Sequence, residues 1–148
     1  MSRASHALGR HLAVAGFMGA GKTTVGTAVA ERIGRRFVDL DVEIERRAAT
    51  SIPDLFGEHG EAGFRRLEEQ IAHEVLAAGE PLVVALGGGA VLSEQTRGEL
   101  AARAFTVLLE IDADTAWERV RRSSRPLAGD RDAFHALHRE RQPVYDAV

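Results

Sequence analysis

The sequence predicts a three-layer α/β/α P-loop fold with a parallel sheet, on three observations. Short apolar runs of strand length alternate with longer segments of helical periodicity along the chain. One of these runs leads into a glycine-rich turn of the form G-x-x-x-x-G-K-[ST], which joins a strand to a helix in P-loop proteins. The 148 residues are enough for one well-buried core and too few for two ordinary domains. We therefore expect a single domain over residues 1–148.

Composition and charge narrow the possible functions. The chain has 19 basic and 22 acidic residues and a formal net charge of −3, which does not indicate a general nucleic-acid or membrane binder. Without cysteine, neither a disulfide framework nor thiolate chemistry is available. No apolar run approaches the roughly 20 residues of a membrane span, and the first residues lack a signal-peptide core. We expect a cytoplasmic monomer whose partners are small molecules, with no nucleic acid and no membrane.

The glycine-rich turn is the strongest local signal. The apolar run 12–15 predicts a buried parallel strand, and it enters the turn GFMGAGKTT at residues 16–24. Such a strand-to-helix turn directs backbone N–H groups at an anion, and the helix dipole adds positive charge. Lys22 is the only lysine in the chain, at a position where a compact ammonium on a flexible stem suits a phosphate. The alternative is a chance glycine-rich turn. The candidate phosphate-binding residues are Gly19, Ala20, Gly21, Lys22, Thr23 and Thr24.

The next two elements follow the turn directly. Val25, Val29 and Ile33 recur at four-residue spacing and predict a helix that Gly34 ends. Residues 37–41 predict a second strand with two acids at its C-terminal end. Because parallel strands end at the same edge of a sheet, these acids should lie beside the glycine-rich turn.

Capping and turn signals divide the rest of the chain. Ser51 resembles a helix N-cap, and residues 63–77 carry an amphipathic stripe of Phe64, Leu67, Ile71 and Val75 that glycine and proline end. An apolar strand over 82–86 then runs directly into three glycines at 87–89. Because these glycines also follow a strand, they should meet the turn and the two acids in space. The further expected elements are a helix over 93–103, a strand over 105–111, a helix from Asp112 or Asp114 to Val120, a loop over 121–131, a helix over 133–141 and a last turn opened by Pro143.

Two residues are candidates to bind Mg²⁺ together with a nucleotide. The Thr23 hydroxyl follows the P-loop lysine and is expected to coordinate the ion between the β- and γ-phosphates. The strand over 82–86 ends in glycines rather than in an acid. Asp39 is therefore the best candidate for a second contact to the ion, through a water molecule. A helix cap or a turn is the alternative role for Asp39.

Asp41 is a candidate general base. Two residues beyond Asp39 in a strand, it would face the same side and lie one step further out. There it could accept a proton from a hydroxyl or amine that attacks the γ-phosphate. In-line phosphoryl transfer needs little more from the protein than this orientation and charge neutralisation. Alternatively, Asp41 caps a helix that begins near Val42.

Five motifs in order resemble those of shikimate kinase. They are the P-loop followed by Asp39-Leu40-Asp41, the segment Phe56…Gly60-Glu61…Phe64-Arg65-Arg66…Glu68, the turn Gly87-Gly88-Gly89, the tripeptide Arg125-Pro126-Leu127, and the segment Arg141…Tyr145. The similarity runs from about residue 12 to residue 145, nearly the whole chain. Any one of the motifs is weak, whereas five in order at compatible spacings are specific.

The resemblance implies transfer of the γ-phosphate of ATP to the 3-hydroxyl of shikimate, in the pathway to aromatic amino acids, with Mg²⁺ as the metal. It implies that the catalytic residues are Lys22, Asp41 and Arg125. It implies a substrate-binding region at about 42–79, with substrate contacts by Asp41, Phe56, Phe64, Arg65, Gly87, Gly88, Gly89 and Arg141. The two arginines would hold the carboxylate by bidentate hydrogen bonds, and the two phenylalanines would form an apolar wall. It also implies a lid at about 122–132, in which Arg125 reaches the transferring phosphate and Arg122 lies near adenine.

The sequence departs from the family in two places. Only two serines separate Arg122 from Arg125, and Ala128 stands where the family often has a second leucine, so lid closure is expected to differ in detail. The chain ends at Val148, where members of the family usually continue into a fifth strand and a terminal helix. We therefore expect four strands, one exposed sheet edge and an incomplete purine site.

Other roles and other functions stay open at this point. Arg65 could simply pair with Glu68 or Glu69 at helical spacing. The glycines at 87–89 could be an ordinary exit from a strand, and Arg122 could belong to a cationic helix end. A related small-molecule kinase of the gluconate type would share the P-loop but lack the paired arginines. A nucleotide-binding protein without turnover is the third possibility.

Overall fold

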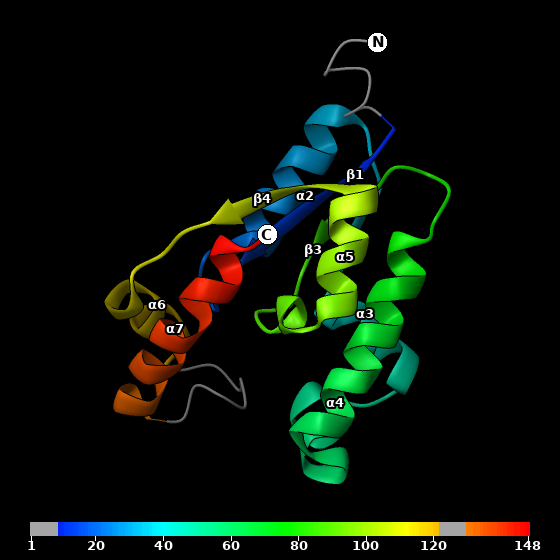
Figure 1. Cartoon of the computed structure of the whole chain (residues 1–148). Coiled ribbons are helices and arrows are strands. Elements are labelled where there is room, and N and C mark those ends of the chain that lie inside the picture. The colour runs from blue at the N-terminus through cyan, green and yellow to red at the C-terminus, as the bar shows by residue number, and fades with distance from the viewer. Residues whose placement is uncertain (1–8, 122–129) are drawn as a thin grey trace.

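The computed structural model describes residues 9–121 and 130–148, which form a parallel sheet between two layers of helices (Figure 1). Within the described residues the sheet has four strands in the order β2-β3-β1-β4. Val14 of the inner strand β1 lies opposite Ala85 of β3 and Val107 of β4. The three-layer fold with four parallel strands is thus as the sequence predicts. The strands are β1 (His11–Gly16), β2 (Phe37–Asp39), β3 (Val83–Ala85) and β4 (Ala104–Leu109).

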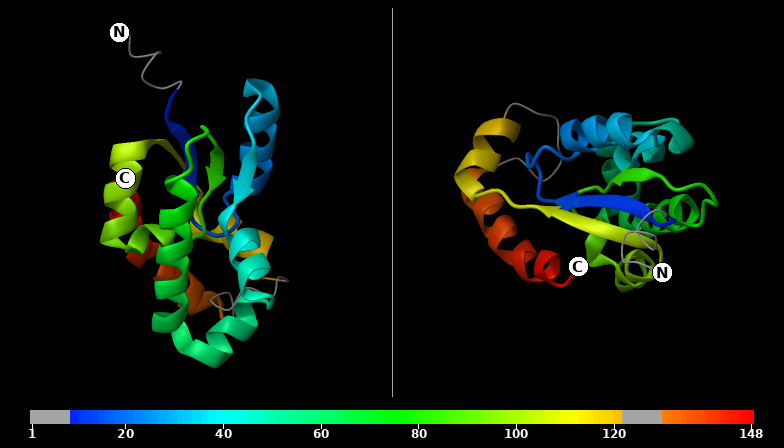
Figure 2. Two further views of the ribbon diagram at one scale, coloured as in Figure 1. Left: turned by 90° about the vertical axis from the view of Figure 1, so that its right-hand side faces the viewer. Right: turned by 90° about the horizontal axis from the view of Figure 1, so that it is seen from above.

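Helices cover both faces of this sheet. Seen from above in Figure 2, α2 lies on one face, and α5 and α7 lie on the other. In the described part of the chain, no helix is both long and apolar enough to cross a membrane. The helices are α2 (Lys22–Ile33), α3 (Leu40–Ala48), α4 (Ile52–Leu76), the 3₁₀ turn η1 (Ala90–Leu92), α5 (Glu94–Arg103), α6 (Ala113–Val120) and α7 (Arg131–Asp146).

The apolar side chains on the two faces of the sheet form one larger and one smaller hydrophobic core. The larger core joins Ala13 and Ala15 of β1 to residues of α4 and α5 such as Leu76 and Leu100. The smaller core lies under α2 and includes Val14, which points to the opposite face from its two neighbours. Because β1 is buried on both faces, its sequence is a continuous apolar run rather than an alternating one.

The second strand is shorter than expected. β2 ends at Asp39 rather than at residue 41, and Leu40 already begins α3, a helix that the sequence offered only as an alternative, with a start near Val42. The Asp39 carboxylate causes this early turn, because it accepts hydrogen bonds from the backbone N–H groups of Asp41 and Val42 and so caps the helix. The cap role left open for Asp39 is therefore confirmed, and the one suggested for Asp41 is wrong.

The two helical signals between residues 51 and 77 correspond to two helical segments of α4 that meet at Gly60. Ser51 caps α4 as expected, with its hydroxyl accepting from Asp54 N at 3.2 Å. The chain then continues to Leu76 with a kink at Gly60, whose φ of 68° and ψ of 177° are not helical. A positive φ of this kind favours glycine, so this residue lets the helix change direction.

The last helix is longer than expected. α7 extends through Pro143, where the sequence suggested a separate turn, and ends at Asp146. Proline removes one hydrogen-bond donor from a helix, and such a position needs support from packing. Arg141 and Tyr145, on either side of the proline, are both buried. Packing of this segment against the rest of the domain therefore holds the helix across Pro143.

Candidate active site

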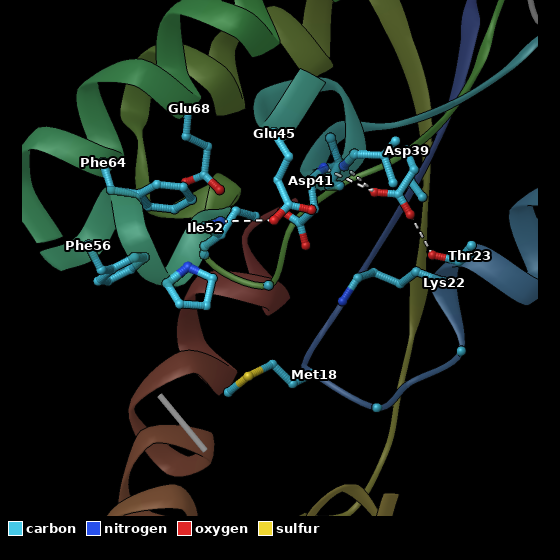
Figure 3. A pocket seen from close by; sticks show the side chains of 18 of the residues that line it. Met18, Lys22, Thr23, Asp39, Asp41, Glu45, Ile52, Phe56, Phe64 and Glu68 are labelled. Atoms are coloured by element: carbon cyan, nitrogen blue, oxygen red, sulfur yellow. Dashed lines mark hydrogen bonds between the residues drawn. The ribbon is translucent and has the colours of Figure 1, made fainter. Parts of the chain in front are cut away.

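A cavity of about 730 Å³ opens where the strands end, at the edge of the sheet to which the sequence assigns its motifs. In Figure 3, Lys22 and Thr23 approach this space from the P-loop, and Phe56, Phe64 and Glu68 approach it from α4. Segments that are far apart in the sequence, from Met18 to Arg141, thus surround one cavity. The lining includes these residues that the sequence singles out: Gly19, Gly21, Lys22, Thr23, Thr24, Asp39, Asp41, Phe56, Phe64, Arg65, Gly88, Gly89 and Arg141.

Two candidates among the described residues, Ala20 and Gly87, do not line the cavity. Ala20 lies in the P-loop, with its N–H bonded to a carbonyl of the same turn at 3.1 Å. Gly87 lies behind Asp41: a Cβ built on it would be 2.7 Å from Asp41 Oδ1, so a larger residue would push that carboxylate away. Arg122 and Arg125, the two arginines of the expected lid, lie outside the described residues.

The P-loop bends at its glycines. Gly21 caps α2 with a φ of 91°, in the left-handed region that other residues rarely adopt. Lys22 then opens the helix, and its ammonium lies back across the loop, donating to Gly16 O at 2.6 Å and to Phe17 O at 3.1 Å. The positive charge of the lysine and the N-terminus of α2 therefore act on the same point at the mouth of the cavity.

Arg119 of α6 contacts the P-loop, a role that sequence reasoning did not assign. Its Nη1 donates to Gly19 O at 2.7 Å, and the side chain lines the cavity. The sequence does show several arginines together at the end of the helix that contains Arg119. The family resemblance, however, assigned Arg122 to the adenine side. Spacing alone does not reveal which of these arginines faces the P-loop, because that depends on where α6 packs.

Thr23 and Asp39 form the oxygen pair expected for a metal. Thr23 Oγ1 donates to Asp39 Oδ2 at 2.6 Å, while Asp39 Oδ1 accepts from the two N–H groups of α3. Among the described residues, no group of three or more His, Cys, Asp or Glu side chains could hold a metal ion by itself. One hydroxyl and one carboxylate oxygen do fit Mg²⁺, which usually takes few protein ligands and completes its shell with phosphate and water oxygens.

Asp41 reaches the cavity from a helix rather than from a strand. It lies in the first turn of α3, so the expectation that it shares a strand face with Asp39 is wrong, although both side chains line the cavity. The N-terminus of a helix stabilises a carboxylate in its charged form. Asp41 Oδ1 lies against Gly87, and the Glu68 carboxylate lies against the same glycine: a Cβ built there would be 2.7 Å from Asp41 Oδ1 and 3.0 Å from Glu68 Oε2. The base candidate is therefore backed by the glycine turn.

Arg65 is held between two rings and an acid. Its Cζ lies 5.9 Å from the centre of the Phe56 ring and 5.3 Å from that of Phe64, distances that allow cation–π attraction. Its Nη1 donates to Glu68 Oε1 at 2.8 Å, so the pairing left open from the sequence is present. The Nε is buried and has no hydrogen-bond partner among the described residues. Arg65 is thus fixed in place with donor capacity still available for a ligand.

Glu68 is a buried acid that sequence reasoning did not count as a site residue. Only 3 % of it is exposed, and burial raises its pKa above the ordinary value, although the Arg65 charge acts in the opposite direction. A signal for it was available. The buried stripe of α4 runs through Phe64, Glu68 and Ile71, whereas Leu67, which was assigned to the stripe, is only partly buried. A charged residue at a core position of a helix is the pattern to look for.

The glycine turn is tied to the last helix. Arg141 is 3 % exposed and its Nη1 donates to Gly88 O at 2.9 Å. Tyr145, one helical turn further on, donates its hydroxyl to the same carbonyl. Gly89 lies beside Arg65, because a Cβ built on it would be 2.5 Å from Arg65 Nη2. The two arginines expected to bind a carboxylate therefore flank consecutive glycines.

Most of the other residues that line the cavity belong to no sequence motif that would predict their place in the site. Glu45, for example, accepts from Ile52 N at 2.9 Å and so ties α3 to the start of α4. Most of the others are apolar residues or backbone that the fold brings to the cavity. The lining residues not singled out from the sequence are Met18, Val42, Glu45, Ile52, Pro53, Glu68, Ala85, Leu86 and Arg119.

Comparison with known sequences finds one family. The family model described as shikimate kinase matches residues 18–148. The chain is 46 % identical over 141 residues to the shikimate kinase of Nitrobacter winogradskyi, covering 93 % of this chain and 65 % of that relative. It is 50 % identical over 136 residues to the shikimate kinase of Thermobifida fusca, covering 90 % of this chain and 78 % of the relative. The chain thus spans 65 % of the length of the first relative and 78 % of the second.

Comparison with solved structures gives the same family. The shikimate kinase of Acinetobacter baumannii in complex with shikimate matches with a TM-score of 0.90 and 35 % identity, covering 97 % of this chain and 82 % of that one. The shikimate kinase of Aquifex aeolicus matches with a TM-score of 0.81 and 33 % identity, covering 92 % and 82 %. A gluconokinase from Sinorhizobium meliloti, at 18 % identity and a TM-score of 0.56 over 87 % of this chain and 73 % of that one, shares the fold alone.

Proposed function

The chain belongs to the shikimate kinase family, and on that premise we propose that it transfers the γ-phosphate of ATP to the 3-hydroxyl of shikimate. The products are shikimate 3-phosphate and ADP, and the reaction is a step of aromatic amino-acid biosynthesis. One observation carries the proposal. A P-loop with its lysine and two largely buried arginines, Arg65 and Arg141, line one cavity, with the Asp41 carboxylate among them. The gluconate-type alternative has only the shared fold behind it.

The donor side binds the phosphates of ATP. The backbone of the P-loop and the Lys22 ammonium surround the β- and γ-phosphates. Arg119 holds the loop at Gly19 from the outside. Thr23 and Asp39 would hold Mg²⁺, which would neutralise charge on the phosphates. Because Asp39 also caps α3, the residue that would hold the metal through a water molecule also fixes the helix that carries the base.

The acceptor side binds the carboxylate and the ring of shikimate. Arg65 and Arg141 each present a planar guanidinium, which pairs with a carboxylate through two parallel hydrogen bonds. The rings of Phe56 and Phe64, whose centres are 4.6 Å apart, form an apolar wall next to Arg65. Because Glu68 already orients the Arg65 fork, little side-chain entropy is lost when the substrate binds.

Asp41 acts as the general base. As the 3-hydroxyl oxygen forms its bond to the γ-phosphorus, the bond from that phosphorus to the β–γ bridging oxygen breaks, and ADP leaves with the electron pair. The hydroxyl proton passes to the Asp41 carboxylate, which lies in the first turn of α3. The site supplies orientation and charge neutralisation, which phosphoryl transfer mainly requires.

The remaining roles concern residues or properties beyond the described geometry. Arg125 reaches the transferring phosphate from the lid, and Arg122 lies near adenine. Gly88 and Gly89, which line the cavity, contact the acceptor through their backbone, whereas Gly87 supports Asp41 from behind. The enzyme acts as a cytoplasmic monomer.

The function is tested by ADP release with ATP and shikimate, with ATP and gluconate, and with ATP alone. We expect turnover only with shikimate. An ADP release that shikimate leaves unchanged would contradict the proposal.

The base is tested separately by Asp41→Asn, which should lower kcat by about 100-fold or more, the usual contribution of a positioned base. Asp54→Asn is the matched control, because Asp54 is an acid in the first turn of α4 that does not line the cavity. Near-normal turnover of the Asp41 variant would show that the base lies elsewhere.

A further inference from the structure

Helix α7 directs two buried donors to one carbonyl oxygen of the glycine turn. Arg141 Nη1 and the Tyr145 hydroxyl both donate to Gly88 O, and the two residues lie four positions apart on the same helix face. Their exposed fractions are 3 % and 2 %. A carbonyl oxygen has two lone pairs, and here both have a donor. The orientation of this peptide is therefore set from α7.

Fixing that oxygen also fixes an N–H group. Gly88 C=O and Gly89 N–H belong to the same planar trans peptide, so they point in opposite directions. Gly88 and Gly89 have no side chain to restrict the peptide, and glycine backbones rotate more freely than others. The donors on α7 hold Gly88 O toward that helix, and the Gly89 N–H consequently points away from it.

The same peptide lies between the two halves of the cavity. A Cβ built on Gly88 would be 3.6 Å from Met18 N of the P-loop and 3.8 Å from the Tyr145 hydroxyl oxygen. On the other side, Gly89 lies against the Arg65 guanidinium. A rotation of this one peptide would therefore move the surroundings of both arginines that line the acceptor side.

We propose that Tyr145 is a positioning residue for the acceptor: with Arg141 it holds the Gly88–Gly89 peptide, so that Gly89 N–H is presented to the acceptor from the side opposite α7 while the Arg141 guanidinium stays in place for the substrate carboxylate. This inference rests on the proposed function. Burial raises the pKa of the Tyr145 phenol above its ordinary value, so the hydroxyl stays a donor at neutral pH. Tyr145 also orients Arg141, since both share one acceptor and the position of one donor limits that of the other.

The variant Tyr145→Phe tests the proposal, because it keeps the buried ring and removes only the hydroxyl. Initial rates with shikimate and ATP varied independently should show a KM for shikimate raised about tenfold, the effect of one lost hydrogen bond to a buried acceptor. The KM for ATP should change by less than about twofold. A residue that only anchors α7 would lower stability without this split between the two substrates.

Thr96→Val is the matched control. Thr96 is equally buried, lies in α5, does not line the cavity, and also loses a hydroxyl in the variant. We expect its KM for shikimate to be that of the wild type. An unchanged KM for shikimate in Tyr145→Phe, or equal rises of both KM values, would overturn the inference while the proposed function stands.

A second readout does not need turnover. Tyr145 is the only tyrosine of the chain, so the ultraviolet difference between the wild type and Tyr145→Phe isolates this phenol. Shikimate should perturb that signal, because its carboxylate binds next to the hydrogen-bonded group, and gluconate should not. A phenol signal that shikimate leaves unchanged overturns the inference. A wild-type chain that neither phosphorylates nor binds shikimate overturns the proposed function and this inference with it.

Discussion

Gly89→Ala should separate acceptor binding from folding. Gly89 has a φ of −109° and a ψ of 3°, which other residues can adopt, so the backbone itself tolerates alanine. The obstacle is Arg65: the new methyl group would lie 2.5 Å from its Nη2 and closer still to Nη1 and Cζ. An ordinary contact between such atoms is about 3.5 Å or more. The guanidinium must therefore move by an ångström or more, away from the place where Glu68 and the two rings hold it.

The size of the effect follows from what Arg65 contributes. A hydrogen bond to a charged group is worth about 1.5 to 3 kcal/mol, which corresponds to about a 10- to 100-fold rise in the KM for shikimate when it is lost. The KM for ATP should stay near the wild-type value, since Arg65 belongs to α4 and the P-loop is not displaced. Steady-state rates with each substrate varied give both constants, and chemical denaturation gives the change in stability.

Gly98→Ala is the matched control for this variant. Gly98 is exposed in the middle of α5, and a Cβ built on it meets nothing within 4 Å. Alanine there should raise the unfolding free energy by about 0.5 to 1 kcal/mol and leave both KM values unchanged.

The reasoning about Gly89 fails in either of two outcomes. One is an unchanged KM for shikimate in Gly89→Ala. The other is seen in the double variant with Arg65→Ala: if the methyl group acts only by displacing Arg65, then Gly89→Ala should cost nothing further once that side chain is gone, and additive effects would refute this.

Two further predictions concern acids of the site. Asp39→Ala should lower the unfolding free energy by about 0.5 to 2 kcal/mol through loss of the α3 cap. It should also raise the Mg²⁺ concentration needed for half-maximal rate. Ser93→Ala removes the α5 cap and should lower only the unfolding free energy. If the two variants have the same Mg²⁺ requirement, Asp39 does not contact the metal. Burial raises the pKa of Glu68, so the stability that its neutral form provides is present below the ordinary value of 4.5 and is lost as pH rises through the raised one. Denaturation at several pH values should therefore show the unfolding free energy of Glu68→Gln increasing with pH relative to the wild type, and a constant difference would contradict this sign.

Local chemistry explains why the nucleotide side could be predicted. The P-loop lies within a few consecutive residues, and the glycines, Lys22 and the strand before them need no distant partner to adopt their geometry. The strand at β1 was equally clear, because burial on both faces leaves a continuous apolar run. The length of β2 was not predictable from such patterns. Asp39 ends the strand because its side chain accepts hydrogen bonds from two N–H groups of the next helix. Strand propensity does not show that this capping competes with continuation of the strand.

The acceptor side depends on contacts that spacing does not encode. The stripe of α4 was assigned through Leu67, although the buried position is Glu68, whose charge is tolerated because Arg65 pairs with it. The two donors to Gly88 O come from more than fifty residues away. Sequence could name Arg141 through the family resemblance, but only the packing of α7 shows which atom it binds.

Two groups at this site, Asp39 and Gly88, each contact both the donor side and the acceptor side. A substitution at either one is therefore expected to affect both substrates. Asp39 contacts the metal-side hydroxyl of Thr23 and also fixes the helix that carries Asp41. Gly88 lies in contact range of the P-loop and accepts both donors of α7. A change at Asp39 on the donor side therefore also shifts the helix that carries the base. A change in α7 likewise shifts the Gly88 carbonyl and with it the acceptor site. Substitutions at such shared groups should alter kcat more than those at single-purpose groups, because phosphoryl transfer depends on the relative placement of donor and acceptor rather than on the affinity for either.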